Sequence, residues 1–470
     1  MSIFRTKDVE LMMQESKRHG LVKTLGALDI TLIGIGVIIG TGIFVLTGVA
    51  AAKYAGPALM LSFVLAGLTV AFVSLAFSEL ASMIPIAGSA YTYTYTAIGE
   101  FWAWMVGWGL VLEYTVGASA VAGGWSAYLT GILASAGIHL PVALTKVPAE
   151  GGVVNLPAIL ITLFLTFLLT RGMRESATLN KVLVFIKLGA IFLFLFLAAP
   201  KINPANWTPF LPYGWSGVAT GAAVIFFAYL GIDSIATSAE EAKHPSRDMP
   251  IGILASLAVC TVLYIAVTAV MTGTTPYPQL DTAEPVTFVL RNLGYHFGSA
   301  IVGTGAIAGL TTVLMVMMYA QTRAFFAMSR DGLIPRALCK LHPKYGTPTT
   351  VTILVGAAVA IMSGLTPIHL VAEMCSIGTL FAFFMAIIGV MRLRKTKPNW
   401  ERPFRCPALF IVGPLALVFS AFVMGNLPVH TWRNFFVWMT IGIVVYFLYG
   451  HKHSVLSRDN ADATPKSNAK

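Results

Sequence analysis

The chain has 470 residues, of which only 11% are Asp, Glu, Lys or Arg and 57% are hydrophobic. Soluble proteins carry about 25% charged residues, so this sequence has too few charges to cover a water-soluble globule of its size. The mean hydropathy of +0.78, together with long apolar runs, predicts an all-α polytopic membrane protein rather than a soluble enzyme.

Twelve segments are apolar and long enough to cross a bilayer, whose hydrocarbon core of about 30 Å needs about 20 helical residues. They lie at residues 28–51, 57–83, 99–129, 154–171, 179–199, 214–239, 249–272, 297–328, 348–365, 371–391, 407–427 and 432–450. These segments leave a short N-terminal segment at 1–27 and a polar tail at 451–470.

The positive charges predict the orientation. Of the 31 Lys and Arg residues, 25 fall on the side of the N-terminus, five fall on the other side, and Lys187 lies within helix 5. Because loops rich in Lys and Arg stay in the cytoplasm, both termini are expected there. The net charge of +11 thus reports topology, and no nucleic-acid partner is expected. The polar first 27 residues are unlike a cleaved signal peptide, and a plasma membrane, in a bacterium the inner membrane, is the expected location.

The sequence lacks the motifs of membrane enzymes and of ATP-driven pumps. It contains no Walker A motif, no HExxH and no GxSxG. The four Cys are widely spaced, and the nine His fall in loops or at helix ends, which predicts no disulfide framework and no metal or haem site. No cofactor and no obligate protein partner is expected. Gradient-driven transport is the favoured class, with a channel as the alternative.

The first helix contains four Gly within nine residues, from Gly34 to Gly42. Each Gly costs about 1 kcal/mol relative to Ala in a helix, so Gly40-Thr41-Gly42 predicts a break at the depth of the bilayer centre. Broken backbone at that depth must line a protein cavity, and the amides that start the second half would suit a carboxylate. The alternative is close helix packing through GxxxG spacing, which we expect for Gly305 and Gly309.

Helix 6 contains a related feature in the run from Phe226 to Asp233. Asp233 is either a functional carboxylate at membrane depth or the N-cap of a resumed half-helix. Helices 1 and 6 each begin a set of five. Two interrupted helices at corresponding places predict an inverted-repeat transporter with its site between the halves.

Four charged side chains lie within or near the apolar segments. Lys187 is about two turns inside helix 5, where an apolar environment disfavours the ammonium, so it can release a proton near neutral pH. The alternative is a permanently charged Lys187 paired with Glu113 of helix 3 or with Asp233. We assign these three residues to proton coupling. Glu79, near the inner end of helix 2, is expected to serve local structure or a cytoplasmic gate.

Three segments of the chain are distinctive: Gly34 to Phe44, Ser78 to Tyr93, and Met328 to Gly332. Together they resemble the amino acid–polyamine–organocation (APC) superfamily. The run from Phe226 to Glu241, with the twelve-helix plan, is most similar to the cationic amino acid transporter branch in its short-loop bacterial form. The likeness extends from about residue 20 to 450. It implies a five-plus-five inverted repeat of the leucine-transporter type, with helices 1 and 6 broken. The transport core would then be residues 28–391, and helices 11 and 12 at 392–450 would be peripheral.

The resemblance also implies a binding site for an L-amino acid. Its carboxylate would meet the amides of Gly40, Thr41 and Gly42. Its ammonium would meet carbonyls of helices 1 and 6, namely those of Ile38, Ile39, Phe227, Ala228 and Tyr229. Phe227 resembles the outer gate of the family, and Ile232 and Met317 complete the expected site. A Lys matching Lys187 takes the place of sodium in proton-coupled members.

The substrate side chain is expected to meet the run from Leu314 to Tyr319, which is apolar and rich in Met. The same run can also be plain core or lipid-facing filling. This wall and Lys187 argue against a long cationic side chain, whereas Glu113 argues for one. The expected function is proton-coupled uptake of small or medium neutral L-amino acids. An exchanger, a cationic amino acid transporter, a channel and a non-transporting sensor are the alternatives.

Overall fold

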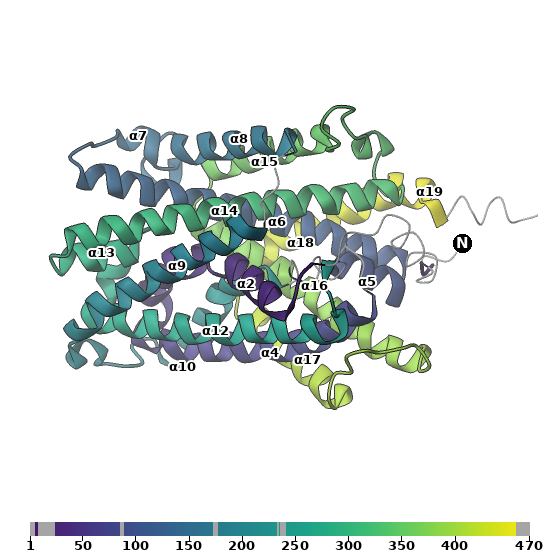
Figure 1. Ribbon diagram of the computed structural model, residues 1–470, viewed down its shortest axis with the longest axis horizontal. Helices are drawn as coiled ribbons and strands as arrows, with labels where there is room; N and C mark the ends of the chain where they lie inside the picture. The colour runs from purple at the N-terminus through teal and green to yellow at the C-terminus, as the bar shows by residue number, and fades with distance from the viewer. Residues whose placement is uncertain are drawn as a thin grey trace, which may run out of the picture.

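The computed structural model describes residues 5–7, 24–84, 89–172, 177–232, 235 and 241–456, and the structural statements below concern these residues. They form an all-helical bundle whose long helices run along the longest axis of the molecule (Figure 1). The β-type pairing within them is a single bridge between Leu25 and Ala242. Lys7 Nζ and the backbone N–H of Val455 both bond to Asp331, at 2.8 and 3.0 Å. We call this end of the bundle the Asp331 end.

Each of the twelve predicted segments contains a helix. The longer helices are α2 (Ala27–Ile38), α4 (Leu59–Met83), α6 (Glu100–Ser135), α8 (Leu156–Thr170), α9 (Ala177–Ala198), α10 (Gly214–Ile225), α12 (Pro245–Thr274), α14 (His296–Arg330), α15 (Thr349–Leu365), α16 (Ile368–Thr396), α17 (Leu409–Gly425) and α18 (Val429–Val445). Within the described residues, seven helical stretches are long and apolar enough to cross a membrane, and five apolar helices are shorter.

Short helices accompany the long ones. They are α3 (Thr47–Ala50), α5 (Ser89–Ala97), α7 (Val142–Thr145), α13 (Pro285–Asn292) and α19 (His451–His453), with π-helical turns at Gly42–Leu46 and Ala51–Ala55 and a 3-10 turn at Phe226–Tyr229. The apolar pattern did not predict α5 or α13. Their sequences are too short or too polar to appear as membrane spans.

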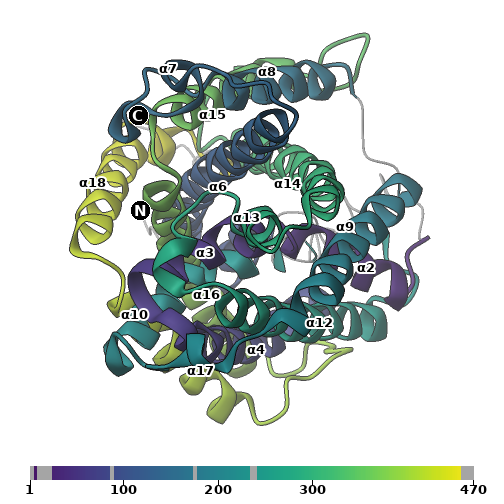
Figure 2. The same ribbon diagram turned by 90° about the vertical axis from the view of Figure 1, so that its left-hand side faces the viewer.

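The helices pack in two groups. In one group α12 packs against α2 and α4, and α10 packs against α4; in the other, α14 and α15 pack against α6, and α8 against α15. Figure 2 shows α8 and α15 on one side of the bundle and α4 and α17 on the opposite side. Helices α9 and α16 contact both groups: α9 packs against α14 and α2, and α16 packs against α6 and α4. These two helices therefore connect the groups.

The GxxxG pair of α14 makes a close helix contact, as predicted. A Cβ on Gly305 would lie 2.7 Å from the Cβ of Ala190 on α9, and a Cβ on Gly309 would lie 2.9 Å from Cε of Lys187. Real Cβ atoms do not approach other atoms this closely, so Gly305 is needed for α9 and α14 to pack, whereas a Cβ at position 309 would require the Lys187 side chain to shift. The second Gly also makes the space that the Lys187 side chain fills.

Candidate functional site

The first helix is interrupted where the glycine run predicts. Helix α2 ends at Ile38, Ile39 is extended with φ −75° and ψ 98°, and helical backbone resumes at Thr41 with φ −57° and ψ −28°. The first amides of a helix have no carbonyl partner within it and carry its positive dipole end. The last carbonyl of α2, at Ile38, and the first amide of the resumed helix, at Thr41, are therefore separated by only two residues.

The sixth predicted segment is also interrupted. Helix α10 passes into the 3-10 turn Phe226–Tyr229, and Leu230 is extended with ψ 148°. Gly231 follows with φ +97°, a left-handed conformation that side chains rarely adopt. A Cβ there would also lie 2.2 Å from Cγ1 of Val37 on α2. Gly is thus required at this bend both for its backbone angle and for its contact with the first helix.

The two interruptions touch each other. A Cβ on Gly42 would lie 2.4 Å from the Cα of Ala228, so the resumed first helix lies directly on the backbone of the 3-10 turn. On α12, the hydroxyl of Tyr264 lies 2.7 Å from the carbonyl oxygen of Ile38 and 2.7 Å from that of Ala228. A hydroxyl has one proton and donates to one carbonyl at a time. Tyr264 therefore bridges the two interruptions from α12.

Thr41 carries an unpartnered hydroxyl at the start of the resumed helix. Its side chain is buried, and its Oγ1 has no hydrogen-bond partner in the described part of the chain. A Cβ on Gly124 of α6 would lie 3.3 Å from the Cγ2 of Thr41, so the methyl group packs on α6. Most buried hydroxyls have a partner, so this one is a donor that a ligand beside the interruption can use.

Lys187 reaches the end of α2 from α9. Its side chain is fully buried, and its ammonium donates a hydrogen bond of 2.5 Å to the carbonyl oxygen of Gly36. Gly36 lies in the last turn of α2, whose carbonyls have no amide partner further along the helix. The buried ammonium thus binds the negative dipole end of the interrupted helix, a few residues from the interruption.

Of the other two predicted proton-coupling residues, the structure describes only Glu113. Glu113 is buried on α6 and faces α16: the Sγ of Cys375 donates to its carbonyl oxygen at 3.0 Å, and a Cβ on Gly378 would lie 3.4 Å from its Cβ. Asp233 lies outside the described residues. The contacts given above for Lys187 are with α2 and α14. Those given for Glu113 are with α16, which is a different helix interface.

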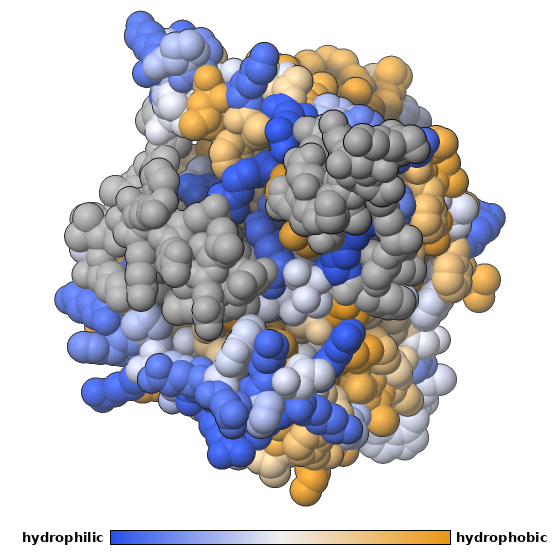
Figure 3. All heavy atoms as spheres, turned by 90° about the vertical axis from the view of Figure 1, so that its right-hand side faces the viewer, coloured by the Kyte–Doolittle hydropathy of each residue, from blue (hydrophilic) through white to orange (hydrophobic). Residues whose placement is uncertain are grey.

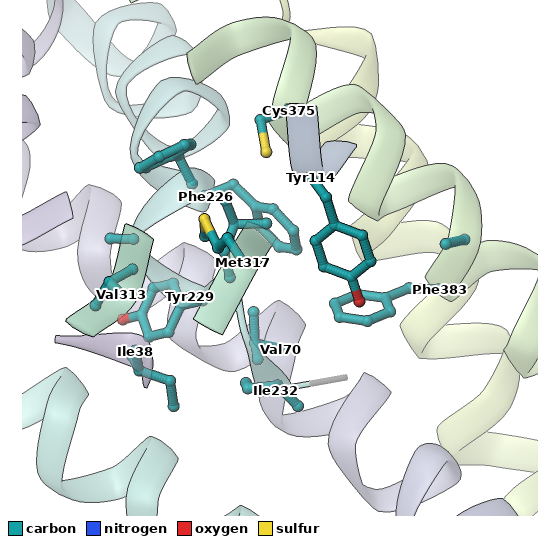
Figure 4. Close-up of a cluster of buried hydrophobic side chains, with 14 of the residues drawn as sticks. Ile38, Val70, Tyr114, Phe226, Tyr229, Ile232, Val313, Met317, Cys375 and Phe383 are labelled. Atoms are coloured by element: carbon teal, nitrogen blue, oxygen red, sulfur yellow. The ribbon is translucent and has the colours of Figure 1, made fainter. Parts of the chain in front are cut away.

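Two sulfur-containing side chains form a wall beside Gly117 of α6. A Cβ on Gly117 would lie 3.0 Å from the Sγ of Cys375 and 3.4 Å from the Sδ of Met317. Figure 4 shows Met317 in the same buried cluster as Ile38 and Tyr229, with Cys375 contributed from α16. The wall is therefore apolar and polarizable, and it lies among the residues predicted for the site.

The remaining predicted residues are all buried. Ile39, Phe227, Tyr229 and Ile232 are each at most 3% exposed. Tyr229 donates its hydroxyl to the carbonyl oxygen of Phe63 on α4 at 3.1 Å, so this hydroxyl is directed to α4. The carbonyl of Phe227 accepts from the backbone N–H of Leu230 at 3.2 Å.

Sequence reasoning missed Tyr264 and Cys375. Tyr264 lies in the middle of an apolar run, and a buried Tyr hydroxyl needs a hydrogen-bond partner, which was a usable signal. Cys375 gave no comparable signal, because a lone Cys in an apolar helix is usually inert filling. Its role in the wall depends on Gly117, which is 258 positions away in the sequence.

Comparison with known proteins gives a consistent result. The family model for amino acid permeases matches residues 25–446. The branched-chain amino acid permease BcaP of Bacillus subtilis (strain 168) is 46% identical over 463 residues, which are 97% of this chain and 99% of that protein. The methylthioribose transporter of the same organism is 45% identical over 459 residues, 97% of this chain and 100% of that protein.

A more distant relative is the vacuolar cationic amino acid transporter 4 of Arabidopsis thaliana. It is 35% identical over 408 residues, which are 85% of this chain and 68% of that protein. All three relatives are named as permeases or transporters and none as an enzyme. The apolar helices and these relatives identify an integral membrane protein, and the chain belongs to the amino acid permease family of the APC superfamily.

Proposed function

We propose that the chain is a secondary active transporter that takes up L-amino acids together with protons by alternating access. In this proposal all twelve predicted segments cross the membrane, as two inverted repeats of five with helices 11 and 12 outside them. Both termini are cytoplasmic, and the membrane is the plasma membrane, in a bacterium the inner membrane. The placement of 25 of the 31 Lys and Arg residues on one side supports this orientation.

The observation that carries the proposal is the contact between the two interruptions at Gly42 and Ala228. The amides at the start of the resumed helix suit a carboxylate, and the carbonyl ends of α2 and of the 3-10 turn suit an ammonium. A free amino acid carries an ammonium and a carboxylate on the same α-carbon. The hydroxyl of Thr41 supplies one further donor at the carboxylate end.

Proton coupling in this proposal uses Lys187. Its ammonium is bound to the carbonyl of Gly36, so loss of the proton removes a charged donor from the end of α2. The conformation of α2 beside the substrate would then depend on the protonation of Lys187. One charge that crosses 100 mV contributes about 2.3 kcal/mol, and each pH unit contributes about 1.4 kcal/mol. Together these are enough for accumulation well beyond tenfold.

A neutral side chain of small or medium size fits the wall formed by Met317 and Cys375. Both are uncharged and polarizable, and neither offers a carboxylate to a cationic side chain. The relative named for branched-chain amino acids supports an apolar substrate. The buried carboxylate of Glu113 and the relatives named for cationic amino acids favour a cationic substrate as the second candidate.

The experiment is uptake into proteoliposomes with an imposed inward proton gradient. The purified protein is first screened by thermal shift against the twenty amino acids and methylthioribose. We expect stabilisation by neutral L-amino acids and their accumulation against a gradient. Stabilisation by methylthioribose alone would exclude the zwitterion site, because this sugar has neither a carboxylate nor an ammonium.

The same vesicles separate the other functions. Uptake that requires an internal amino acid would identify an exchanger. Single-channel conductance would identify a channel, and binding without flux would identify a sensor. Accumulation driven by the proton gradient alone excludes all three.

A further inference from the structure

Glu79 of α4 is a buried carboxylate at the Asp331 end of the bundle. Its side chain is 1% exposed. Arg394, in the last turn of α16, donates to both of its oxygens, with Nε at 3.1 Å from Oε1 and Nη2 on Oε2. The backbone N–H of Cys406 donates to Oε2 at 2.8 Å, and Nε of Arg402 lies 3.3 Å from Oε1. The carboxylate therefore accepts hydrogen bonds from one guanidinium and one amide, and a second guanidinium lies within ion-pair distance.

The segment between α16 and α17 is wrapped around the side chain of Arg402, which bonds to its backbone. Its guanidinium donates to four carbonyl oxygens at 2.7 to 3.1 Å, those of Leu393, Lys397, Pro398 and Trp400. Leu393 lies in the last turn of α16, and its carbonyl oxygen already accepts the backbone N–H of Lys397 at 2.9 Å. Arg402 adds a second donor there and also bonds to the carbonyl of Lys397, the residue directly after α16. The segment is thus organised by a side chain whose remaining face meets Glu79.

One further hydrogen bond attaches this segment to α4. The backbone N–H of Phe404 donates to Oγ of Ser82 at 3.3 Å, and this hydroxyl donates to the carbonyl of Glu79 at 3.0 Å. Ala408, directly before α17, has φ +44°. A residue other than Gly is rarely found in this strained conformation, which persists only where the surroundings impose it. The chain therefore enters α17 through a left-handed residue, directly after the contact of Cys406 with Glu79.

The sequence left two roles open for Glu79, local structure and a gate. A gate must separate during each cycle, and separation here would expose Glu79 and leave Arg394 and Arg402 without their carboxylate. A buried ion pair that loses one partner is strongly destabilised. The side chains of Arg394 and Arg402 are only 11% and 7% exposed, so water cannot replace Glu79 unless the whole segment moves. These contacts favour a joint over a gate.

We propose that Glu79 is a positioning residue that joins α4 to the end of α16 and the start of α17 as one rigid unit. The joint stays closed throughout the transport cycle, so α17 moves with α4 and is part of the moving machinery. This inference rests on the proposed transport function. Figure 3 shows the Asp331 end, where hydrophilic side chains gather, and Figure 1 shows the segment between α16 and α17 at that end.

The test is a covalent lock across the joint. Ser82→Cys and Phe404→Cys are combined with Cys339→Ser and Cys406→Ser, and the pair is closed by oxidation or by a short bis-methanethiosulfonate linker. The hydrogen bond of 3.3 Å from the backbone N–H of Phe404 to Oγ of Ser82 shows that residues 82 and 404 are close enough for such a link with little movement. The matched controls are the two single Cys variants, treated in the same way.

We expect the cross-linked protein to take up amino acid at a rate within about twofold of its reduced form. Loss of uptake on cross-linking that a reductant restores would overturn the joint, because the two sides would then have to separate. Failure of the proposed function is seen separately, as absence of uptake by the wild-type protein in the same vesicles.

A second experiment substitutes Glu79. Glu79→Gln should lower the maximal uptake rate by about tenfold or more while KM stays within about twofold, because Glu79 lies away from the interruptions. Glu79→Asp, which keeps the charge, should recover part of the rate. A changed KM with an unchanged maximal rate would overturn the proposal, because it would place Glu79 in the substrate path.

Discussion

Gly42 lies so close to Ala228 that a Cβ added to it would be 2.4 Å from the Cα of Ala228. Because that neighbour is backbone, it cannot rotate away, and a side chain at position 42 must push the two interruptions apart. We predict that Gly42→Val abolishes stabilisation by amino acids in a thermal-shift assay. Wild-type affinity in this variant would contradict the site.

Gly40 provides the matched control for this prediction. A Cβ there would lie 3.2 Å from Cγ2 of Val313, a side-chain atom that can adjust. Gly40→Ala should therefore keep more of the binding than Gly42→Ala, although both add one methyl group to the same interruption. Equal losses would mean that glycine is needed for backbone flexibility rather than for the contact with Ala228.

Lys187→Ala should remove the response of uptake to pH. The variant loses the ammonium that binds the carbonyl of Gly36, so no proton at this position can change the end of α2. We expect residual uptake, or exchange, that does not change with an imposed pH gradient in proteoliposomes. Uptake by this variant that is still driven by the gradient would remove Lys187 from the coupling mechanism.

Gly309→Ala tests the geometry of Lys187 without removing its charge. The added Cβ would lie 2.9 Å from Cε of Lys187, so the side chain must move away from α14. We predict weaker coupling with a retained pH response, measured as a lower accumulation ratio at the same gradient. A variant with wild-type accumulation would show that the fit between Lys187 and α14 is unimportant for coupling.

Tyr264→Phe should loosen the contact between the interruptions. The hydroxyl that bridges the carbonyls of Ile38 and Ala228 is lost, and a buried carbonyl left without its donor costs about 1–3 kcal/mol. We expect a lower Tm and weaker substrate binding. Tyr229→Phe is the control, because its hydroxyl bonds to Phe63 on α4; it should lower Tm with little effect on binding. The reverse ranking in binding would contradict this assignment.

Cys406 should react slowly with alkylating reagents. Burial, and next the charge of Glu79, raise the pKa of its thiol to about 11, so about one thiol in a thousand is ionised at pH 8. Because the thiolate is the reactive form, labelling should keep rising by about tenfold per pH unit from pH 8 to 10. The measurement is mass spectrometry of iodoacetamide adducts, with the denatured protein as control. A rate that levels off by pH 8.5 would contradict the raised pKa.

Much of the site could be predicted because its signals are local. The cost of the glycines in the first helix depends on intrinsic helix energetics, and the interruption follows the helix end at Ile38. The depth of Lys187 follows from the apolar residues around it, and a close helix contact at Gly305 follows from GxxxG spacing. None of these predictions required knowledge of which helices are neighbours.

The partners of these residues could not be predicted. Lys187 and Gly36 are 151 positions apart, and Glu79 and Arg394 are 315 apart. The basic residues near position 400 predicted a cytoplasmic loop, but many equivalent cations could have met Glu79. Tyr264 is one of 15 Tyr in the chain, and its pattern alone does not show that it reaches both interruptions.

The sequence by itself determined that the chain is a membrane-embedded helical protein, that its first helix is interrupted, and that a Lys is buried in helix 5. These properties depend on hydrophobicity and backbone energetics, which act within a single helix. Only the tertiary structure decided that Gly42 meets Ala228, that Tyr264 bridges both interruptions, and that Glu79 holds α16 and α17 to α4. The physical reason is that contacts between distant residues depend on how whole helices pack, and small side chains at those contacts allow several packings until all helices are in place.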